Sequence, residues 1–563
     1  MKKALPVIIA ILLILIIGGS YGAKIVLEKF SYSKEKADLN EYFEINNDNE
    51  VAVILQEDLM DFKALRVEGY CYLDIDTVQD YLNERFYLDE AEQLIIYVEP
   101  LQITTTHIGD SGYDIDGEAH HTDFVPARYI DNKLYLACDY VKFFTNYQYT
   151  YYENPSRIQM YTQWDVKEVA HIKKDTQIRK LGGIKSPILK EVSEGDKVQV
   201  LDTMEEWSCV KTEDGFKGYV ENKKLDNYSN EEPIPVTDYI EPEFTSVSFD
   251  GKVNMAWHNV AGTAGNDTIY GLLANTHGIN VISPTWFALA DNSGGLTDFG
   301  SQKYVIDMHE KGMQVWPTVN NFVNSDIDTY AVLSATTTRR VLIANIMSLI
   351  STYGVDGINV DFENLSVETG QPFIQFIREL SVQCRKNGII LSVDNYVPIG
   401  NTNYYNRSEQ GVYADYVVIM GYDEHYAGSS EAGSVASIGY VENGILKTME
   451  EVPSEKIING VPFYTRIWET NGVDVTSQAV GMQMAKDYVA NHGMTLKWDQ
   501  ETCQNYGEYM SGDTLCQVWM EDAESIKVKL SVMDANNIAG VASWCLGFET
   551  PDIWDAISEY TGK

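Results

Sequence analysis

The stretch Asp356-Gly357-Ile358-Asn359-Val360-Asp361-Phe362-Glu363 decides the fold. Side chains of a β-strand point to alternate faces, so Asn359, Asp361 and Glu363 share one face and the apolar residues between them share the other. In an ordinary half-exposed strand the polar face would simply be hydrated. That explanation fails if both faces are covered, and the flanking sequence predicts that they are.

Helix-like segments lie on both sides of this strand. Residues 335–354 carry apolar side chains at helical spacing and end on Gly354, where a C-cap is expected. Residues 370–388 repeat the pattern. Helix, strand and helix form the repeating unit of an α/β barrel with parallel strands. In such a barrel the acidic face points into the interior, and Glu363 lies at the C-terminal mouth, where barrel enzymes keep their chemistry.

Asp361 and Glu363 form a candidate acid pair. Two partly desolvated carboxylates on one face repel each other, which moves their pKa values apart and leaves one of them protonated near neutral pH. Such a group can act as a general acid. The alternative interpretation is a hydrated acidic turn after the strand, which an isolated D-x-E pattern does not exclude.

The full eight residues resemble the signature of glycoside hydrolase family 18, the chitinase-like barrels. That signature reads D-G-x-D-x-D-x-E with apolar residues at each x, and it holds here except at its middle aspartate, which is Asn359. The resemblance implies that Glu363 is the catalytic acid. Asn359 cannot share a proton with Asp361, so the pH profile of the family does not transfer directly.

The C-terminal region, residues 244–563, contains enough strand-like segments for a complete (β/α)8 TIM barrel, which is the predicted α/β fold. The eight segments are residues 253–257, 281–286, 314–319, 357–362, 389–395, 416–422, 457–462 and 540–544. Further helix-like segments are residues 301–312, 434–452 and 522–537. The interval between the seventh and eighth strands is too long for one helix, so residues 475–520 are predicted to include an inserted α+β lobe.

Other strands bring polar and aromatic residues to the same mouth. Met420-Gly421-Tyr422-Asp423 matches the family motif M-x-Y-D, and Trp544 matches the tryptophan that floors the sugar site beside the scissile bond. A single aromatic residue on a strand usually belongs to the core, but three strands converge here. Second-rank candidates for substrate contacts at strand ends are Asn320, Trp286, Asn395, Tyr396 and Arg466.

The resemblance implies retaining hydrolysis without an enzyme nucleophile. Glu363 would protonate the glycosidic oxygen, while the carbonyl oxygen of the substrate's own 2-acetamido group attacks C1. Asp361 would hold the amide N–H, and Tyr422 would hydrogen-bond the acetamido carbonyl. No metal or cofactor is implied.

The flanking sequence narrows the expected substrate. Residues 283–287, 461–466 and 544–549 look like the branch of the family that contains spore-cortex and cell-wall N-acetylglucosaminidases of Gram-positive bacteria. This branch implies cleavage of peptidoglycan after N-acetylglucosamine. Two alternatives are a hydrolase of chitin-type oligosaccharides and a non-catalytic, lectin-like wall-binding protein, against which Glu363 argues.

Two smaller domains are predicted before the barrel. Residues 51–164 contain a weak repeat, in which Tyr72–Val78 returns as Tyr135–Val141, and resemble the small α+β domain at the N-terminus of copper amine oxidases. No copper-ligand cluster accompanies the resemblance, which implies attachment or spacing. Residues 166–226 resemble a bacterial SH3 domain through the pattern from Trp207 to Val220. Such domains commonly bind cell-wall peptides, although a folded spacer is the alternative. Residues 227–243, with three prolines, form the linker.

Length and composition restrict the class of protein and its partners. The chain has 563 residues and a net charge of −41, which indicates several domains and argues against a nucleic-acid partner. Its 37 tyrosines and 10 tryptophans suit sugar stacking, although most of them are expected in cores. Its seven scattered cysteines define no disulfide framework and no metal spacing. The oligomeric state is not indicated.

The N-terminus predicts export. Lys2-Lys3 precede an uncharged run, residues 4–23, that is about long enough to cross a bilayer. We expect residues 1–23 to form an uncleaved membrane anchor, followed by a stalk over residues 24–50. A cleaved signal peptide is the competing interpretation, because Ser20 and Gly22 supply small residues before a cut. In either case the remainder of the chain lies outside the cytoplasm.

Overall fold

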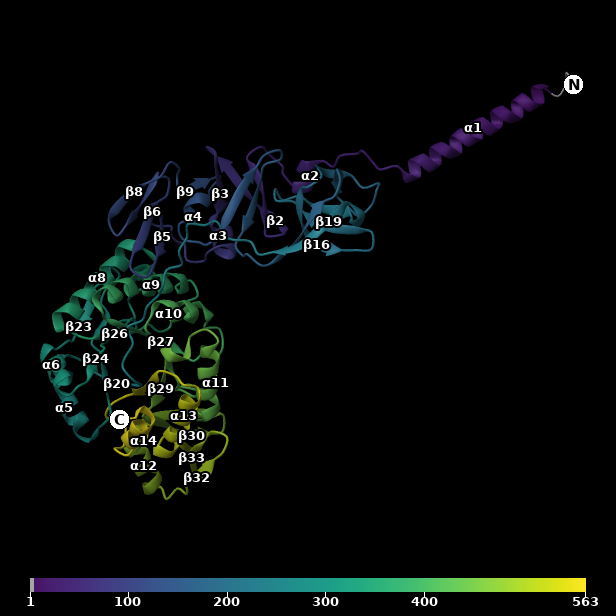
Figure 1. The fold of residues 1–563 in the computed structure, drawn as a ribbon. Helices are drawn as coiled ribbons and strands as arrows, with labels where there is room; N and C mark the ends of the chain where they lie inside the picture. The colour runs from purple at the N-terminus through teal and green to yellow at the C-terminus, as the bar shows by residue number, and fades with distance from the viewer. Residues whose placement is uncertain (1–4, 563) are drawn as a thin grey trace. The chain divides into compact units, whose positions relative to one another are not determined.

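The computed structural model describes residues 5–562, which form two compact units (Figure 1). One unit contains Met1–Phe86, Thr106–Asp114 and Ala119–Glu241, and the other contains Tyr87–Thr105, Ile115–Glu118 and Pro242–Lys563. The predicted 51–164 domain is therefore divided between the two units. Lys2-Lys3, on which the predicted membrane topology depends, lie outside the described residues.

The second unit contains the predicted barrel, and the fold prediction is confirmed. Its parallel strands are β20 (Val253–His258), β21 (Val281–Pro284), β24 (Gln314–Val315) continued by β25 (Thr318–Asn320), β26 (Gly357–Asp361), β27 (Ile390–Tyr396), β28 (Tyr416–Met420), β29 (Ile457–Pro462) and β35 (Gly540–Trp544). Strand β35 pairs with both β29 and β20, which closes the ring. The third strand is split at Pro317, since proline has no N–H for the ladder.

Helices surround the strands, as Figure 1 shows. They are α6 (Gln302–Glu310), α8 (Thr336–Tyr353), α9 (Gly370–Asn387), α10 (Arg407–Tyr413), α11 (Ile438–Met449), α13 (Ala523–Ala535) and α14 (Ile553–Thr561). Gly354 and Gly388 end α8 and α9 with φ values of 68° and 66°, in the left-handed region that glycine adopts without strain.

The alternation of β26 separates two apolar clusters. Ile358 and Val360 are buried in the large cluster that also contains side chains of the surrounding helices. A second cluster, which includes Trp257, fills the interior of the barrel. The indole N–H of Trp257 donates to Asn359 Oδ1 at 3.1 Å. Because β20 and β26 are not neighbours in the sheet, this bond crosses the interior, so the polar face of β26 points inward.

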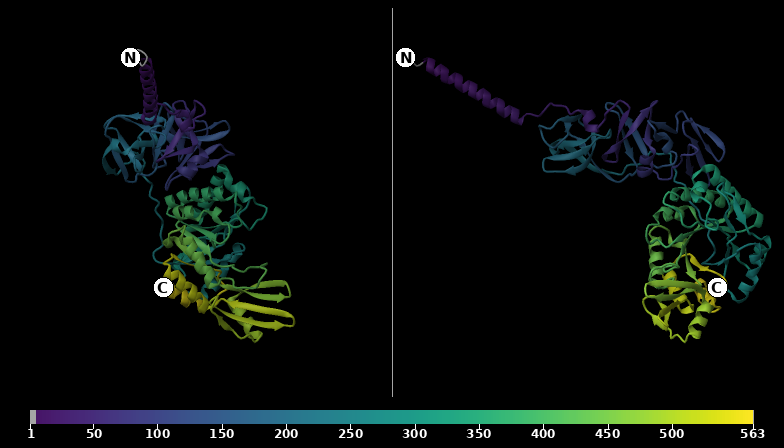
Figure 2. Two further views of the ribbon diagram at one scale, coloured as in Figure 1. Left: turned by 90° about the vertical axis from the view of Figure 1, so that its right-hand side faces the viewer. Right: turned by 180° about the vertical axis from the view of Figure 1, so that it is seen from behind.

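The inserted lobe follows β29. It contains a five-stranded sheet in the order β31-β30-β34-β33-β32, and Figure 2 shows these strands beside the barrel. Its elements are β30 (Tyr464–Asn471), β31 (Asp474–Gly481), α12 (Met482–Asn491), β32 (Lys497–Asp499), β33 (Gln504–Ser511) and β34 (Thr514–Met520). The lobe starts at Tyr464, earlier than the predicted residue 475, because β30 continues almost directly from the seventh barrel strand.

A hairpin from far upstream packs on the barrel helices. It consists of β4 (Tyr87–Asp89) and β5 (Leu94–Val98), whose apolar side chains belong to the same cluster as the barrel helices. Helix α8 has no side-chain N-cap of its own. Instead, the Asp89 carboxylate accepts hydrogen bonds from the main-chain N–H and the hydroxyl of Thr336, at 2.6 and 2.5 Å. The hairpin therefore supplies the missing cap.

The first unit contains two seven-stranded sheets. The first has the order β11 (Gln148–Tyr152), β12 (Arg157–Tyr161), β1 (Glu50–Leu55), β2 (Asp58–Val67), β3 (Tyr70–Asp74), β10 (Lys133–Ala137) and β9 (Ala127–Ile130). It includes both copies of the predicted repeat, since β3 and β10 are each followed by a short helix and pair with each other. The second sheet forms the SH3-like domain, in the order β15 (Ile188–Val192), β14 (Thr176–Arg179), β18 (Lys217–Glu221), β17 (Trp207–Lys211), β16 (Lys197–Thr203), β13 (Lys167–Ile172) and β19 (Leu225–Glu231). Preceding both is helix α1 (Leu5–Phe30), of which Val7–Phe30 is long and apolar enough to span a membrane. All seven cysteines are free thiols.

Candidate active site

Glu363 lies two residues beyond Asp361, the last residue of β26, at the C-terminal end of the barrel. The side chain of Asn321 fixes its main chain from both directions: Asn321 Oδ1 accepts from the Glu363 N–H at 2.8 Å, and Asn321 Nδ2 donates to the Glu363 carbonyl at 2.9 Å. The chain then turns at Asn364, whose φ is 53°. Glu363 is therefore held at the mouth with its side chain half-buried.

Tyr396 orients the Glu363 carboxyl. Its hydroxyl donates to Glu363 Oε2 at 2.7 Å and accepts from the N–H of Asn364 at 3.2 Å. Burial raises the pKa of Glu363, the bond from Tyr396 acts in the opposite direction, and the charge of Asp423 raises it further. A carboxyl with a raised pKa, held in place but still accessible, is suited to donate a proton.

Asp361 lies deeper in the barrel than Glu363. It is 9% exposed, and no group of the described residues donates a hydrogen bond to its Oδ1 atom. Burial, and then the charge of Glu363, raises the pKa of Asp361 to about 8. A buried acceptor without a donor costs about 1–3 kcal/mol. The position therefore favours a ligand that presents an N–H group to Asp361.

A second buried acid, Asp394, reaches the same place from β27. The Asn359 side-chain amide donates to Asp394 Oδ1 at 2.7 Å and to the Ser392 hydroxyl at 3.0 Å. Asp394 is 2% exposed. Burial, followed by the charge of Asp361, raises the pKa of Asp394 well above its usual value. Asp394 was not among the residues that the sequence predicted, although it alternates with Tyr396 along one strand face.

Two of the second-rank candidates do not lie at the mouth. Asn395 is buried on the opposite face of β27 and exchanges hydrogen bonds with Gln410 of α10, so the prediction missed the inward-facing residue by one position. Trp286 is completely buried, and its indole N–H donates to Asn266 at 2.7 Å. Because it belongs to the cluster between strands and helices, it cannot contact a sugar.

The end of β28 and the loop that follows it contribute the M-x-Y-D residues. Tyr422 is half-buried and lies edge-on to Tyr464, with ring centroids 6.3 Å apart. Asp423 is exposed and accepts a hydrogen bond from the Tyr464 hydroxyl at 2.5 Å. Met420, the last residue of β28, is half-buried beside them. Tyr464, the first residue of β30, is thus an additional site residue that the sequence did not indicate.

Three further predicted residues complete the mouth. Trp544 ends β35, is half-buried, and packs edge-on against Trp257 at 5.9 Å. Asn320 ends β25 directly opposite Asp361 in the strand register, and its Oδ1 atom has no hydrogen-bond partner among the described residues. On β30, Arg466 donates to the Ser477 hydroxyl at 3.1 Å.

Within residues 5–562, no three or more His, Cys, Asp or Glu side chains are grouped so that they could hold a metal ion.

Sequence comparison assigns the barrel to a family. The model of glycosyl hydrolases family 18 matches residues 252–549, and that of the bacterial SH3 domain matches residues 175–226. The first match covers more than half of the chain, which therefore belongs to glycosyl hydrolases family 18 and carries a bacterial SH3 domain. The resemblance of residues 51–164 to copper amine oxidases stays a prediction.

Individual relatives agree with this family. A Bacillus subtilis protein provisionally named a sporulation-specific glycosylase is 31% identical over 42% of this chain, and the cortical fragment-lytic enzyme of the same species is 27% identical over 44%. The matched stretch spans 59% of the length of each of these relatives. Among solved structures, the C-terminal domain of a protein from Desulfitobacterium hafniense, provisionally named a chitinase, aligns with a TM-score of 0.50. This alignment has 20% identity and covers 55% of this chain and 99% of that one, so it supports the fold.

Proposed function

We propose that the protein is an exported, retaining glycoside hydrolase that cleaves β-1,4 bonds after N-acetylglucosamine in peptidoglycan. The observation that carries this proposal is the pairing of two unlike carboxyls at one strand end. Glu363 is half-buried and oriented by Tyr396, whereas Asp361 is buried and has an acceptor atom without a donor. These different environments suit Glu363 to act as the general acid and Asp361 to stabilise the positive charge that develops on the substrate.

In the proposed first step, Glu363 protonates the glycosidic oxygen as the bond to C1 breaks. The carbonyl oxygen of the substrate's 2-acetamido group attacks C1 and forms an oxazolinium ion. The amide N–H donates to Asp361, and this hydrogen bond favours the ionised form of Asp361 at the moment when positive charge develops. Water then attacks C1 and displaces the carbonyl oxygen, which restores the acetamido group. Glu363 accepts a proton from the water, and the configuration is retained.

Two aromatic residues support this step. The hydroxyl of Tyr422 would donate to the acetamido carbonyl oxygen, and burial raises the pKa of Tyr422 well above its usual value, which keeps the hydroxyl protonated. Trp544 would provide an apolar floor under the sugar ring. Met420, Asp423, Asn320 and Arg466 lie around them as the proposed substrate contacts.

Asp394 acts as a positioning residue in this proposal. It holds the amide of Asn359, which in turn occupies the position of the missing aspartate of the family signature. Burial and the charge of Asp361 raise the pKa of Asp394, so the ionisation of each acid opposes that of the other. The pair thereby avoids placing two negative charges in the barrel interior.

The choice of peptidoglycan rests on the relatives and on the other parts of the chain. One relative carries the name cortical fragment-lytic enzyme, and the chain combines the barrel with a bacterial SH3 domain. The apolar helix Val7–Phe30 supports placement outside the cytoplasm, with the helix retained as an anchor. Chitin-type oligosaccharides are the alternative substrate.

Glu363→Gln tests the chemistry. It should lower turnover of natural glycan by about 10²–10⁴-fold, because the leaving group then departs without a proton. Turnover of an aryl glycoside with a good leaving group should fall much less, whereas Asp361→Asn should slow both substrates. A substrate with a free 2-amino group should be inert in the wild-type enzyme. A covalent glycosyl-enzyme trapped on Asp361 would overturn the mechanism.

A second measurement tests the substrate. Mass spectrometry of products from purified peptidoglycan should show N-acetylglucosamine at each new reducing end. Faster cleavage of chito-oligosaccharides than of peptidoglycan, at equal enzyme concentration, would favour the alternative substrate. No product from either glycan would support a non-catalytic, wall-binding protein.

A further inference from the structure

The inserted lobe carries a surface groove that the proposed mechanism does not use. It encloses about 480 Å³ between helix α12 and the strands β30 and β31, and we call it the lobe groove. The helix contributes Met484, Asp487, Tyr488 and Asn491, whose spacing of three and four residues places them on one side of α12. Ligand sites commonly have volumes of about 300–1,000 Å³, so a groove of this size is suited to a short ligand.

The lobe groove lies on the face of the lobe sheet that points away from the active site. Successive side chains of β30 alternate between the two faces of the sheet. Tyr464 lies on one face, where its hydroxyl contacts Asp423 at the barrel mouth. Ile467 and Glu469 lie on the other face, and both line the groove beside α12. A ligand in the lobe groove is therefore separate from a sugar at the barrel mouth.

Tyr488 gives the groove an aromatic wall that is held in place. Its hydroxyl shares a hydrogen bond of 3.0 Å with the hydroxyl of Tyr509 on β33. The centroid of the His492 ring lies 4.2 Å from that of the Tyr488 ring. Because these contacts already restrict the ring, little side-chain freedom is lost when a ligand stacks on it. Flat aromatic rings of this kind stack on the apolar faces of sugar rings.

Several polar side chains of the groove are available to a ligand. Within residues 5–562, the side chains of Glu469, Gln478 and Asn491 form no hydrogen bond and no ion pair. Asp487 accepts a hydrogen bond from the side-chain amide of Gln483 at 2.9 Å, which fixes its carboxylate on the groove wall. Carboxylates accept hydrogen bonds from hydroxyl groups, and side-chain amides both donate and accept. This set of groups beside an aromatic ring matches the hydroxyl and acetamido groups of a sugar.

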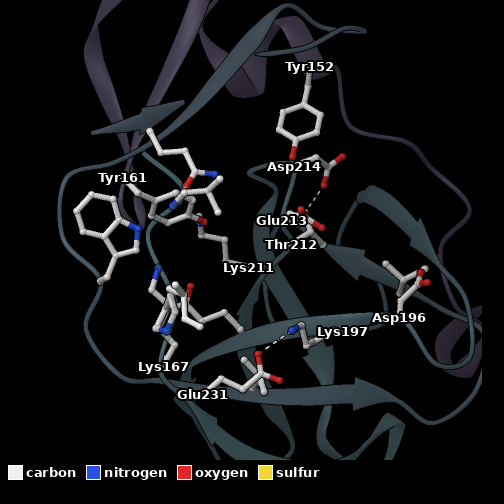
Figure 3. Close-up of a pocket in the computed structure, with 18 of the residues that line it drawn as sticks. Tyr152, Tyr161, Lys167, Asp196, Lys197, Lys211, Thr212, Glu213, Asp214 and Glu231 are labelled. Carbon is white, nitrogen blue, oxygen red and sulfur yellow. Dashed lines mark hydrogen bonds and ion pairs between the residues drawn. The ribbon is translucent and has the colours of Figure 1, made fainter. Parts of the chain in front are cut away.

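The charge of the lobe groove limits the class of ligand. A larger cavity in the first unit, of about 720 Å³, is lined by several lysines, among them Lys167, Lys197 and Lys211 (Figure 3). By contrast, the described residues that line the lobe groove include no lysine, arginine or histidine. A phosphate or a carboxylate would meet Glu469 and Asp487 without a compensating positive charge. The lobe groove therefore favours an uncharged ligand that is rich in hydroxyl groups.

We propose that the lobe groove is a second glycan-binding site, which takes a short uncharged stretch of an N-acetylhexosamine chain. A sugar ring stacks on Tyr488, and its hydroxyl groups donate to Glu469 and Asp487. A polymer bound here stays at a high local concentration for the barrel, which cleaves it elsewhere along the chain. The choice of sugar rests on the proposed function, whereas the existence of the site rests on the groove itself.

Binding of N,N′-diacetylchitobiose to the full chain in detergent tests the proposal. Glu363→Gln in every sample prevents hydrolysis during the titration. We expect two molecules of disaccharide per chain, and Tyr488→Ala should reduce this number to one. Tyr488→Phe keeps the ring and removes only the hydroxyl that contacts Tyr509, so it should retain both binding events.

Glu469→Gln provides a milder variant that leaves the packing of the lobe unchanged. It should weaken the second binding event by about 10-fold, because a neutral amide is a poorer acceptor for sugar hydroxyls than a carboxylate. The matched control is Asp513→Asn, which removes an exposed carboxylate at the turn between β33 and β34. This control should leave both binding events unaltered.

Kinetics give an independent measurement in the enzyme with Glu363 intact. Tyr488→Ala should raise KM for polymeric glycan, because a polymer can reach both sites at once. The same variant should leave kcat/KM for a short aryl glycoside unchanged, since that substrate needs only the barrel mouth.

A titration that neither Tyr488→Ala nor Glu469→Gln alters would overturn the second site, even where the wild-type enzyme hydrolyses glycan normally. A wild-type enzyme without hydrolase activity, but with a binding event that Tyr488→Ala removes, would contradict the proposed function alone. Putrescine that displaces the disaccharide at equal concentration would show a cation site and would overturn the sugar assignment. Binding of the disaccharide that weakens steeply as salt is added would do the same.

Discussion

The amide of Asn359 donates to Asp394 Oδ1 at 2.7 Å, which joins two neighbouring barrel strands through their inward-facing side chains. This bond connects the departure from the family signature to a buried acid that the signature does not contain. Asp361 therefore has a buried acid near it that comes from the neighbouring strand, at a position outside the signature.

Asp394→Asn should move the pH profile of kcat/KM to lower pH. The ionised forms of Asp394 and Asp361 repel each other, so a neutral amide at residue 394 lets Asp361 lose its proton at lower pH. The control is Ser392→Ala, which deletes the other acceptor of the Asn359 amide without changing charge. An unshifted profile with lowered kcat would mean that Asp394 only holds Asn359 in place.

Tyr396→Phe should move the alkaline limb of the pH profile of kcat/KM to higher pH. The hydrogen bond from Tyr396 stabilises the ionised form of Glu363, so its loss raises the pKa of Glu363 and keeps the acid protonated for longer. Tyr405→Phe is the matched control, because the Tyr405 hydroxyl donates to the carbonyl of Phe362 instead. An alkaline limb that moves to lower pH would contradict the proposed effect of Tyr396 on the pKa of Glu363.

Asp89→Ala should destabilise the barrel by about 1–3 kcal/mol, because the N–H and hydroxyl of Thr336 lose their buried acceptor. The exposed neighbour Glu90 provides a control, and Glu90→Ala should have little effect. Denaturant unfolding, monitored by the loss of hydrolase activity, measures the stability of each variant. Equal midpoints for the two variants would show that α8 does not depend on this cap.

The helix Val7–Phe30 should keep the protein at the membrane, with the residues that follow it outside. Protease added to intact cells should remove the barrel, and the full-length chain should sediment with membranes. Replacing Leu12 by Arg should release the protein or block its export, since a charge within the span is costly. Recovery of the wild-type protein in the medium, beginning near residue 23, would show that the segment is a cleaved signal.

Local patterns predicted most of the barrel and part of its site. The alternation of Asn359 and Asp361 with apolar neighbours is a property of a few consecutive residues, so it placed β26 correctly. The same reasoning failed by one residue at Asn395, because Asp394, Asn395 and Tyr396 are all polar or aromatic and do not reveal which face is covered. Tyr464 could not be predicted, since its role depends on a contact with Asp423 from another strand end.

Long-range packing explains why the domain boundaries were not predicted from the sequence. Nothing in residues 87–98 indicates that their apolar side chains pack on helices more than 200 residues later, because a buried strand has the same sequence pattern whatever covers it. The predicted domain boundary at residue 164 rests on sequence periodicity. The compact units are instead defined by which segments pack together in space.

The upstream hairpin also determines how the chain can be divided. A single protease cut in the linker, residues 227–243, would leave the β4–β5 hairpin covalently on the N-terminal fragment while it remains packed on the barrel helices. The two fragments should therefore elute together until they are denatured. An expression fragment that starts at Pro242 would expose the surface that Leu94 and Ile96 cover, and it would leave the N-terminus of α8 without the Asp89 carboxylate. The smallest autonomous form of this barrel is consequently discontinuous in sequence.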